Sequence, residues 1–504
     1  MKKSISKISF SLSLSTVTVL SCMTPAIALT PSELKEGARD EGVKTYMNSK
    51  NNQEDYCILP PQFSLQNENQ QTKFVKSPIM FSDRDRKREE KLCSLDLNTS
   101  PLCPKVGSTN PGVFVISHED APKGTDINYC KGREFGLEAK FKQSITCSYS
   151  GSALAAYHLS RILGNLFITP VVVARSMDKA RHDELITQAL EILDGRNSET
   201  IYKAWTQFNK ASISNPLPHK IYLSNGQLYG ALSENIKHEF NYTEVSGVGP
   251  YETRYSRFKQ QGPFNLVKSE QSMSELSGSD LVTIESLPQL QQMIDVSNMV
   301  VLDSLLSQDD RIGNIHFLLS YATLNPDGSY SKTPVEKEYL KNIETRFKKR
   351  SLSRWSAKEI ISETKNYVSF KSSDKNFNTK GILLREMVLK DNDCGVDVDK
   401  RANMMRQIGA LEEVKHFSPI TYKNILRLYS LVQAESAEVK NFFLKTLLYR
   451  ESDYSKPNTV SFKNNLKYVA NDLKARCKAG KLKLDLGLKL VGNEIHYTQE
   501  NCDI

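Results

Sequence analysis

The spacing of apolar residues predicts a strand-rich region between residues 106 and 235. Short apolar runs alternate there with turn residues, and one segment carries apolar side chains at the three-to-four-residue spacing of a helix. An Asn-Gly pair between two alternating runs is typical of a hairpin turn. The expected elements are strands at 113–116, 138–142 and 171–173, a helix at 152–163, and a hairpin at 221–232 around Asn225-Gly226.

Beyond about residue 280 the pattern becomes mainly helical. Residues 325–380 interrupt it with a polar, basic stretch, which predicts an insertion or a mobile loop. The tail from 481 to 495 begins with alternating Lys and Leu, which indicates an edge strand or an amphipathic segment. The other expected elements are a helix at 287–306, a strand at 382–389 and helical structure over 420–448.

The N-terminus has the pattern of a secretory signal. Lys2, Lys3 and Lys7 precede a Ser/Leu/Val-rich stretch, and Ala26-Ile27-Ala28 fits a small-x-small cleavage site. Residues 29–105 are polar and predict an extension fastened to the body of the protein, with little core of its own. The expected division is a signal at 1–28, this extension, a strand-rich lobe at 106–235, a mainly helical lobe at 236–450 with the insertion, and a tail at 451–504.

Cysteine usage agrees with export. Loss of the signal removes Cys22 and leaves eight cysteines, an even number that predicts disulfides whose pairing stays open. The alternative is a cytoplasmic chain with free thiols. The sequence has no Cys-x-x-Cys pair or Cys/His cluster at zinc spacing, which argues against a zinc site. We therefore expect an exported protein, periplasmic or secreted.

Composition narrows the choice of partners. Of 504 residues, 39% are hydrophobic and 25% charged, as in soluble globular proteins. After the signal, no stretch is long and apolar enough to be a transmembrane span. The net charge of +9 is modest for this length and does not indicate nucleic acid. Two basic runs, at 84–88 and 346–350, are interpreted as solvated faces, with a polyanionic activator as the alternative.

An acidic loop at 305–314 carries the first candidate chemistry. It places Asp309, Asp310 and Asn314 between two apolar segments, at the edge of the expected core. Carboxylate and amide oxygens so placed could orient a hydroxyl and bind a divalent cation. The alternative is an ordinary Asp-rich turn with an Asp–Arg ion pair.

A second acidic turn follows the strand at 382–389. Asp391 and Asp393 come directly after it, and Gly395 closes the turn. Earlier in the chain, Lys140 and Lys142 alternate along the strand at 138–142. A lysine, a hydroxyl-orienting carboxylate and a metal ligand are the parts that phosphoryl transfer requires. Taken singly, each segment could equally be a turn or a solvated strand.

The order of these segments resembles the secretory-pathway atypical kinases, a family that includes the Golgi casein kinase and Four-jointed proteins and is related to HipA-type kinases. Residues 152–163 are similar to its A-A-F-H-L-D-R-I-L-like helix, and Pro170-Val171-Val172 to the P-P-V-like strand after it. The similarity covers roughly residues 135–430. The other matching stretches are 228–232 with the G-S-L region, 303–311 with D-F-L-x-G-N-x-D-R-H, Asp391-Asn392 with D-N-G, and 421–428 with T-Y-L-R-L.

The resemblance implies an α+β, bilobed atypical protein-kinase-like fold, with a small strand-rich N-lobe and a mainly helical C-lobe. It implies an ATP-dependent kinase that uses Mg or Mn and transfers the γ-phosphoryl group to Ser or Thr of a protein substrate, with a glycan acceptor as the alternative. Lys142, with Lys140 beside it, would bind phosphate, and Asp310 would be catalytic. Asp391 would bind the metal, with Asn314 as a second ligand.

Four departures bear on activity. The helix glutamate of the family is Ala153 here, and the His after Asp-Arg is Ile312. The glycine of D-N-G is Asp393, an extra acid that could compensate at the metal. Asn314 stands one residue closer to Asp310 than expected, which keeps Asp309 as an alternative catalytic residue. A nucleotide-binding pseudokinase acting as a scaffold or allosteric partner, and an exported binding protein without a nucleotide site, remain alternatives. His158 is interpreted as a packed or capping residue.

Overall fold

The fold is mixed α+β, and the paired strands of its sheets run antiparallel. A computed structural model describes most of the chain. Residues 1–27, which hold the expected signal and Cys22, lie outside the described residues, as do 341–380, most of the expected insertion. The described residues are 28–49, 51–68, 71–117, 121, 127–131, 136–195, 199–325, 327, 329–338, 340, 381–396, 403–447, 454 and 461–503.

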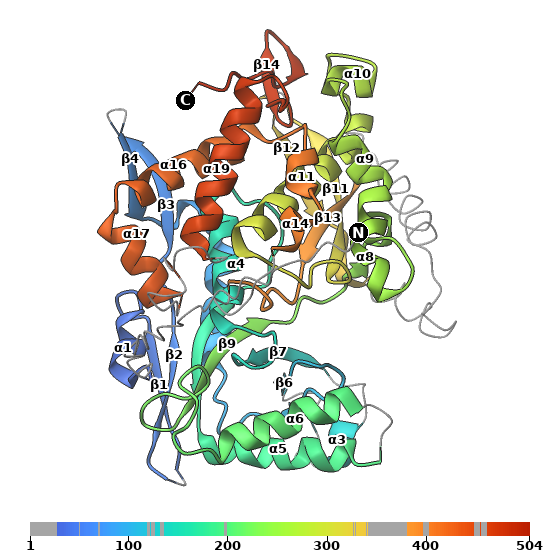
Figure 1. Ribbon diagram of the computed structural model, residues 1–504. Helices are drawn as coiled ribbons and strands as arrows, with labels where there is room; N and C mark the ends of the chain where they lie inside the picture. The colour runs from blue at the N-terminus through green and yellow to red at the C-terminus, as the bar shows by residue number, and fades with distance from the viewer. Residues whose placement is uncertain are drawn as a thin grey trace, which may run out of the picture.

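A seven-stranded sheet forms the lower half of the molecule in Figure 1. Helices α5 (Lys179–Leu193) and α6 (Glu199–Ser212) pack against each other beside it, and α5 contacts its edge strand. In spatial order the strands are β1 (Val43–Met47), β2 (Glu54–Ile58), β8 (Val172–Met177), β9 (Leu228–Glu234), β7 (Leu137–Lys142), β6 (Gly112–Ile116) and β5 (Leu102–Pro104).

Helix α4 (Ser150–Ile162) lies between this sheet and the helical half of the protein (Figure 1). All of its residues are buried, because it packs on β8 and β9 on one side and on α11 (Leu287–Leu306) on the other. Helix α2 (Asp83–Ser94) packs against the same sheet. Its Asp85 forms a buried two-point ion pair with Arg161 of α4, with N–O distances of 3.0 Å.

A second sheet lies in the other half. Strand β11 (Ile315–Leu324) pairs with β10 (Phe240–Asn241), β12 (Tyr330–Pro334) and β13 (Ile382–Leu389). Because Ile315 pairs with Leu389, the loop before β11 and the loop after β13 emerge side by side. The surrounding helices include α7 (Thr243–Ser246), α8 (Arg254–Gln260), α9 (Gly262–Val267), α10 (Met273–Ser277), α14 (Met404–Gln407), α15 (Ala410–Glu413), α16 (Pro419–Gln433), α17 (Ala437–Asn441) and α19 (Phe462–Lys478).

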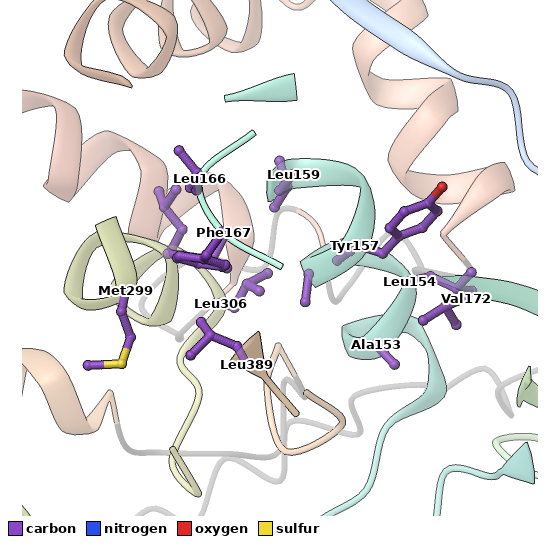
Figure 2. Close-up of a cluster of buried hydrophobic side chains, with 14 of the residues drawn as sticks. Ala153, Leu154, Tyr157, Leu159, Leu166, Phe167, Val172, Met299, Leu306 and Leu389 are labelled. Atoms are coloured by element: carbon purple, nitrogen blue, oxygen red, sulfur yellow. The ribbon is translucent and has the colours of Figure 1, made fainter. Parts of the chain in front are cut away.

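The larger hydrophobic core runs through both halves. Figure 2 shows a part of it that includes side chains of α4, α11 and the end of β13. Since the contact of α4 with α11 joins the sheet to the helical half, it fixes the lysine strand β7 relative to the loop after β13. The side chains labelled there are Ala153, Leu154, Tyr157, Leu159, Leu166, Phe167, Val172, Met299, Leu306 and Leu389.

Several expected elements are confirmed, with small changes at their ends. The strands at 113–116, 138–142 and 171–173 and the helix at 152–163 are present as β6, β7, β8 and α4, and the predicted bounds of α11 and β13 are correct. The hairpin at 221–232 forms only in part, through the Tyr222–Leu228 bridge. Helical structure over 420–448 is divided between α16 and α17, and a short π-helix follows at Phe442–Thr446.

The extension and the tail contribute strands to the fold. β1, β2 and β5 come from residues 29–105 and join the large sheet, which therefore crosses the boundary expected at 105. Residues 325–380, expected as an insertion, contain β12 where they are described. The remaining elements at the two ends are α1 (Pro31–Glu36), β3 (Phe63–Glu68) with β4 (Gln71–Lys76), α3 (Ile127–Lys131), and the hairpin of β14 (Leu488–Val491) with β15 (Glu494–Tyr497).

All eight cysteines that follow residue 28 are paired in four disulfides, as expected for an oxidising compartment outside the cytoplasm. Three bridges join residues 25 to 36 positions apart, whereas the fourth joins residues 247 positions apart. In the described part of the chain, no helix is both long and apolar enough to span a bilayer. The bridges are Cys57–Cys93, Cys103–Cys130, Cys147–Cys394 and Cys477–Cys502.

Candidate functional site

Strand β7 carries two lysines on the face opposite its core residues. Ala139 and Phe141 are fully buried in the core of the large sheet. Because side chains alternate along a strand, Lys140 and Lys142 both point away from that core. Lys142 is the last residue of β7, and it is nevertheless almost completely buried, with 6% of its surface exposed. A buried ammonium group requires partners, and the second half of the chain supplies them.

The Lys142 ammonium bridges the two aspartates that follow β13. Its Nζ lies 2.8 Å from Asp391 Oδ1 and 2.8 Å from Asp393 Oδ1. Although burial alone would lower the pKa of Lys142, the two carboxylates outweigh it and raise that pKa. The Lys142 charge holds the pKa of Asp391 well below its usual value. Burial opposes this effect at Asp393, whose pKa is still lowered, so both acids are ionised at neutral pH.

The two aspartates differ in their access to solvent. The Asp391 side chain is 33% exposed, whereas that of Asp393 is 2% exposed. Asp393 also accepts a hydrogen bond from the Ser148 hydroxyl. Asp393, which the sequence predicts as a metal ligand, is thus the more buried of the two acidic partners of Lys142. Asp391 is the acid of this pair that retains access for a metal ion or a substrate.

Contacts from the start of α4 hold the loop after β13. The Tyr149 N–H donates to the Asp393 carbonyl oxygen at 2.6 Å, and the Ser152 hydroxyl donates to the Asn392 carbonyl oxygen at 2.7 Å. The Cys147–Cys394 bridge joins the same two segments covalently. Asp391 itself has a positive φ of 46°, a conformation that these surrounding contacts stabilise.

The loop after α11 is braced against the same segment. Arg311 is fully buried and forms a two-point ion pair with Asp303 of α11, at 2.9 and 3.0 Å. Its guanidinium also donates to the Lys390 carbonyl oxygen and to Asn392 Oδ1. The Asp–Arg pair of the alternative interpretation thus exists, but its acid is Asp303. Arg311 orients the two loops and does not neutralise the carboxylate of Asp310.

Asp310 and Asn314 lie next to each other beside Asp391. The Asp310 carboxylate accepts a hydrogen bond from the Tyr251 hydroxyl at 3.1 Å. The Asn314 side-chain amide donates to the Asp310 backbone carbonyl oxygen at 2.7 Å, and the backbone carbonyl oxygen of Asn314 accepts from the Lys390 N–H at 3.1 Å. Burial raises the pKa of Asp310, with smaller contributions from neighbouring acids that include Asp391. A carboxylate of this kind is suited to accept a proton from a hydroxyl.

Asp309, the alternative catalytic residue, has its backbone engaged on both sides. Its N–H donates to the Cys394 carbonyl oxygen at 3.2 Å, and its carbonyl oxygen accepts from the Tyr255 hydroxyl. These two hydrogen bonds fix the backbone of Asp309. The carboxylate that contacts Asn314 and Tyr251 is that of Asp310.

Helix α4 contributes no carboxylate to this site. Ala153 occupies the position at which the resemblance leads us to expect a glutamate, and α4 contains no acidic residue. His158 is fully buried against the rings of Phe81, Tyr157 and Phe442, as expected for a packed residue. Burial lowers the pKa of His158 to about 3, so its ring is neutral.

Sequence reasoning missed three residues near this site. The charge of Lys105, at the end of β5, interacts with Lys142 and Asp391, and burial lowers the pKa of Lys105 to about 8. Burial also lowers the pKa of Lys390 to about 7 and that of His316 to about 4. Lys390 precedes Asp391 in the sequence, and this position was a weak indication that it belongs to the site. The sequence gave no indication for Lys105 and His316, because only the pairing of strands brings them here.

The described residues include no cluster of three or more His, Cys, Asp or Glu side chains that could hold a metal by themselves. Two oxygen donors, Asp391 and Asn314, nevertheless come from adjoining loops. Magnesium is commonly bound by one or two carboxylates together with substrate phosphates, and this donor set fits that pattern. A separate cavity of about 920 Å³ lies between α2, the end of β9 and the β11–β13 sheet, and none of the candidate residues lines it.

Comparison of the chain with protein-family models, with curated proteins and with solved structures finds no match in any of the three.

Proposed function

We propose that this protein is an exported, ATP-dependent kinase that transfers the γ-phosphoryl group to a hydroxyl. The observation that carries the proposal is the contact of Lys142 with Asp391 and Asp393, residues about 250 positions away, beside the Asp310–Asn314 loop. Phosphoryl transfer requires a cation at the phosphates, an acid that holds the metal and an acid that orients the acceptor hydroxyl. They converge here from three separate segments.

Each residue has a role in this proposal. Lys142 binds phosphate oxygens of ATP, and Asp393 keeps its ammonium in place. Asp391, with Asn314, holds Mg or Mn, which would neutralise charge on the phosphates. Asp310 orients the acceptor hydroxyl and takes its proton as the bond from oxygen to the γ-phosphorus forms and the bond to the bridging oxygen breaks.

The architecture supports a kinase-like arrangement of two lobes. The large sheet with α4 would be the N-lobe and the part built on α11 the C-lobe, with the site between them. The favoured acceptor is Ser or Thr of a protein, and a glycan hydroxyl is the alternative. The signal-like N-terminus and the four disulfides support export to the periplasm or the medium.

A nucleotide-binding pseudokinase is the second candidate, and Ala153 is the observation that favours it. Without an acid on α4, the usual link between that helix and the lysine is missing. Asp393 weighs against this candidate, because it gives Lys142 a buried anionic partner from the loop after β13.

The test is transfer of label from γ-labelled ATP, with Mg or Mn, to the protein itself and to dephosphorylated protein acceptors. We expect Asp310→Asn and Asp391→Asn to reduce the rate at least about a hundredfold, since each removes a group used in the transition state. Asp280→Asn, at an exposed position, is the matched control. Nucleotide binding without transfer would favour the pseudokinase. Label transfer insensitive to both site variants would refute catalysis here.

A further inference from the structure

The connection between β5 and β6 brings Lys105 against Lys142. The Lys105 N–H donates to the Gly112 carbonyl oxygen at 2.9 Å, and Gly112 pairs with Lys142 across β6 and β7. A Cβ atom at Gly112 would lie 3.6 Å from Lys142 Cγ and 3.9 Å from Lys105 Cδ. The aliphatic stems of both lysines therefore run over the bare α-carbon of this glycine.

The same connection is also held beside the loop after β13. Asn110 donates through its amide to Cys147 Sγ at 3.1 Å and to Cys394 Sγ at 3.6 Å, and the Thr146 hydroxyl donates to Asn110 Oδ1 at 2.5 Å. Cys394 directly follows Asp393 in the sequence. These contacts therefore hold the connection between β5 and β6, which carries Lys105, close to the loop after β13.

Lysines around Asp391 fall into two kinds. Lys142 contacts both aspartates, and Lys390 forms an ion pair with Glu239. Lys105 and Lys140 have no ion pair or side-chain hydrogen bond with any residue that the structure describes. Both are half-buried, and both lie close enough to Asp391 and Asp393 for their charges to interact. A half-buried ammonium group without a partner is ready to bind an anion.

Charge balance indicates the size of that anion. Lys142 bridges Asp391 and Asp393, and Lys390 pairs with Glu239, so these two lysines already have carboxylate partners. Lys105 and Lys140 have no such partner in the described part of the chain, and a divalent cation on Asp391 would add two further positive charges. Lys105, Lys140, Lys142 and a cation on Asp391 would each take up phosphate oxygens of the ligand. A chain of phosphates offers oxygens at several positions.

We propose that Lys105 and Lys140 bind phosphate oxygens of the donor, so that the site recognises a linear polyphosphate chain and not chiefly the base attached to it. This inference rests on the proposed function, because it concerns the same site. The ligand class is a metal-bound polyphosphate, with nucleoside triphosphates and inorganic tripolyphosphate as members.

Isothermal titration of the full mature chain, in the presence of Mg, tests this. The ligands are ATP, GTP, tripolyphosphate and adenosine, and the variants are Lys105→Gln and Lys140→Gln. Lys474→Gln, at an exposed position of α19, is the control. We expect tripolyphosphate to bind within about tenfold of ATP and each site variant to weaken both at least about tenfold, as for loss of a charge-assisted hydrogen bond. Thermal unfolding near the wild-type midpoint shows that a variant is folded.

The outcomes separate this inference from the proposed function. If ATP binds and is used, but tripolyphosphate does not bind or both lysine variants keep wild-type affinity, the inference is overturned and the kinase proposal stands. Tripolyphosphate binding sensitive to both variants, without ATP binding, supports the polyphosphate site and overturns the kinase. Adenosine binding as tightly as ATP would overturn recognition through phosphate.

Discussion

Removal of Lys142 should expose the difference between its two acidic partners. In Lys142→Met, the Asp393 carboxylate would be left 2% exposed without a cation, whereas Asp391, at 33%, can be rehydrated. Breaking a buried ion pair by deleting one partner destabilises proteins by about 3–5 kcal/mol, and exposed pairs contribute about 0–1 kcal/mol. We therefore expect Lys142→Met to destabilise the fold by about 3–5 kcal/mol, mainly through Asp393.

Two double-mutant cycles measure this difference. Pairing Lys142→Met with Asp393→Asn removes both buried charges, so the loss should fall short of the sum of the single losses by about 2 kcal/mol or more. Pairing it with Asp391→Asn should give a coupling below about 1 kcal/mol. Urea unfolding followed by circular dichroism at pH 7 gives the free energies. Equal couplings in the two cycles, or a near-additive Asp393 cycle, would refute the assignment of Asp393 as the buried anchor.

Three further predictions concern other buried groups. Burial raises the pKa of Asp295 from 3.8 to about 7, so the free energy of unfolding should fall as pH rises between these values. In urea unfolding, Asp295→Asn should flatten this dependence and stabilise the protein by up to about 4 kcal/mol at pH 8. An unchanged pH dependence in the variant would contradict this prediction. Replacing both cysteines of the Cys147–Cys394 bridge with serine should lower the free energy of unfolding by about 5 kcal/mol. The same change at Cys477–Cys502 should lower it by about 3 kcal/mol, because that bridge closes a loop about ten times shorter. Equal losses in the same assay would argue against this account. His158→Phe should leave thermal stability unchanged or raise it by about 1 kcal/mol, because neither buried ring nitrogen has a partner among the described residues; a loss of several kcal/mol would contradict a packing role.

The elements that sequence predicted best are those whose apolar spacing is regular and whose ends coincide with polar loops. α11 carries apolar residues at helical spacing, and β13 is apolar except for Arg385 and Glu386, so local spacing was sufficient. The polar extension was harder to interpret. β2 joins the large sheet through Cys57 and Ile58, which pair with Arg175 and Ala174, more than a hundred residues away. No local pattern specifies a pairing of that kind.

The residues of the candidate site also fall into those that local sequence patterns indicated and those that they did not. Asp310 and Asp391 could be identified because each lies in an acidic turn next to an apolar run, and the resemblance gave them an order. The burial of Asp393 against Lys142 could not be predicted, because it joins residues far apart in the sequence. Lys105 was missed because it follows the three-residue strand β5, and only the pairing of β5 with β6 and of β6 with β7 brings it to the site.

The most direct test of the proposed phosphoryl-transfer centre is equilibrium binding of ATP with and without Mg or Mn, measured for wild type, Lys142→Met and Asp391→Asn. The account predicts one ATP per chain, dependence on the divalent cation, and loss of at least about tenfold in affinity in each variant, after unfolding measurements show that the variants are folded. Absence of ATP binding at millimolar concentration, or binding that neither variant nor metal removal changes, would contradict it.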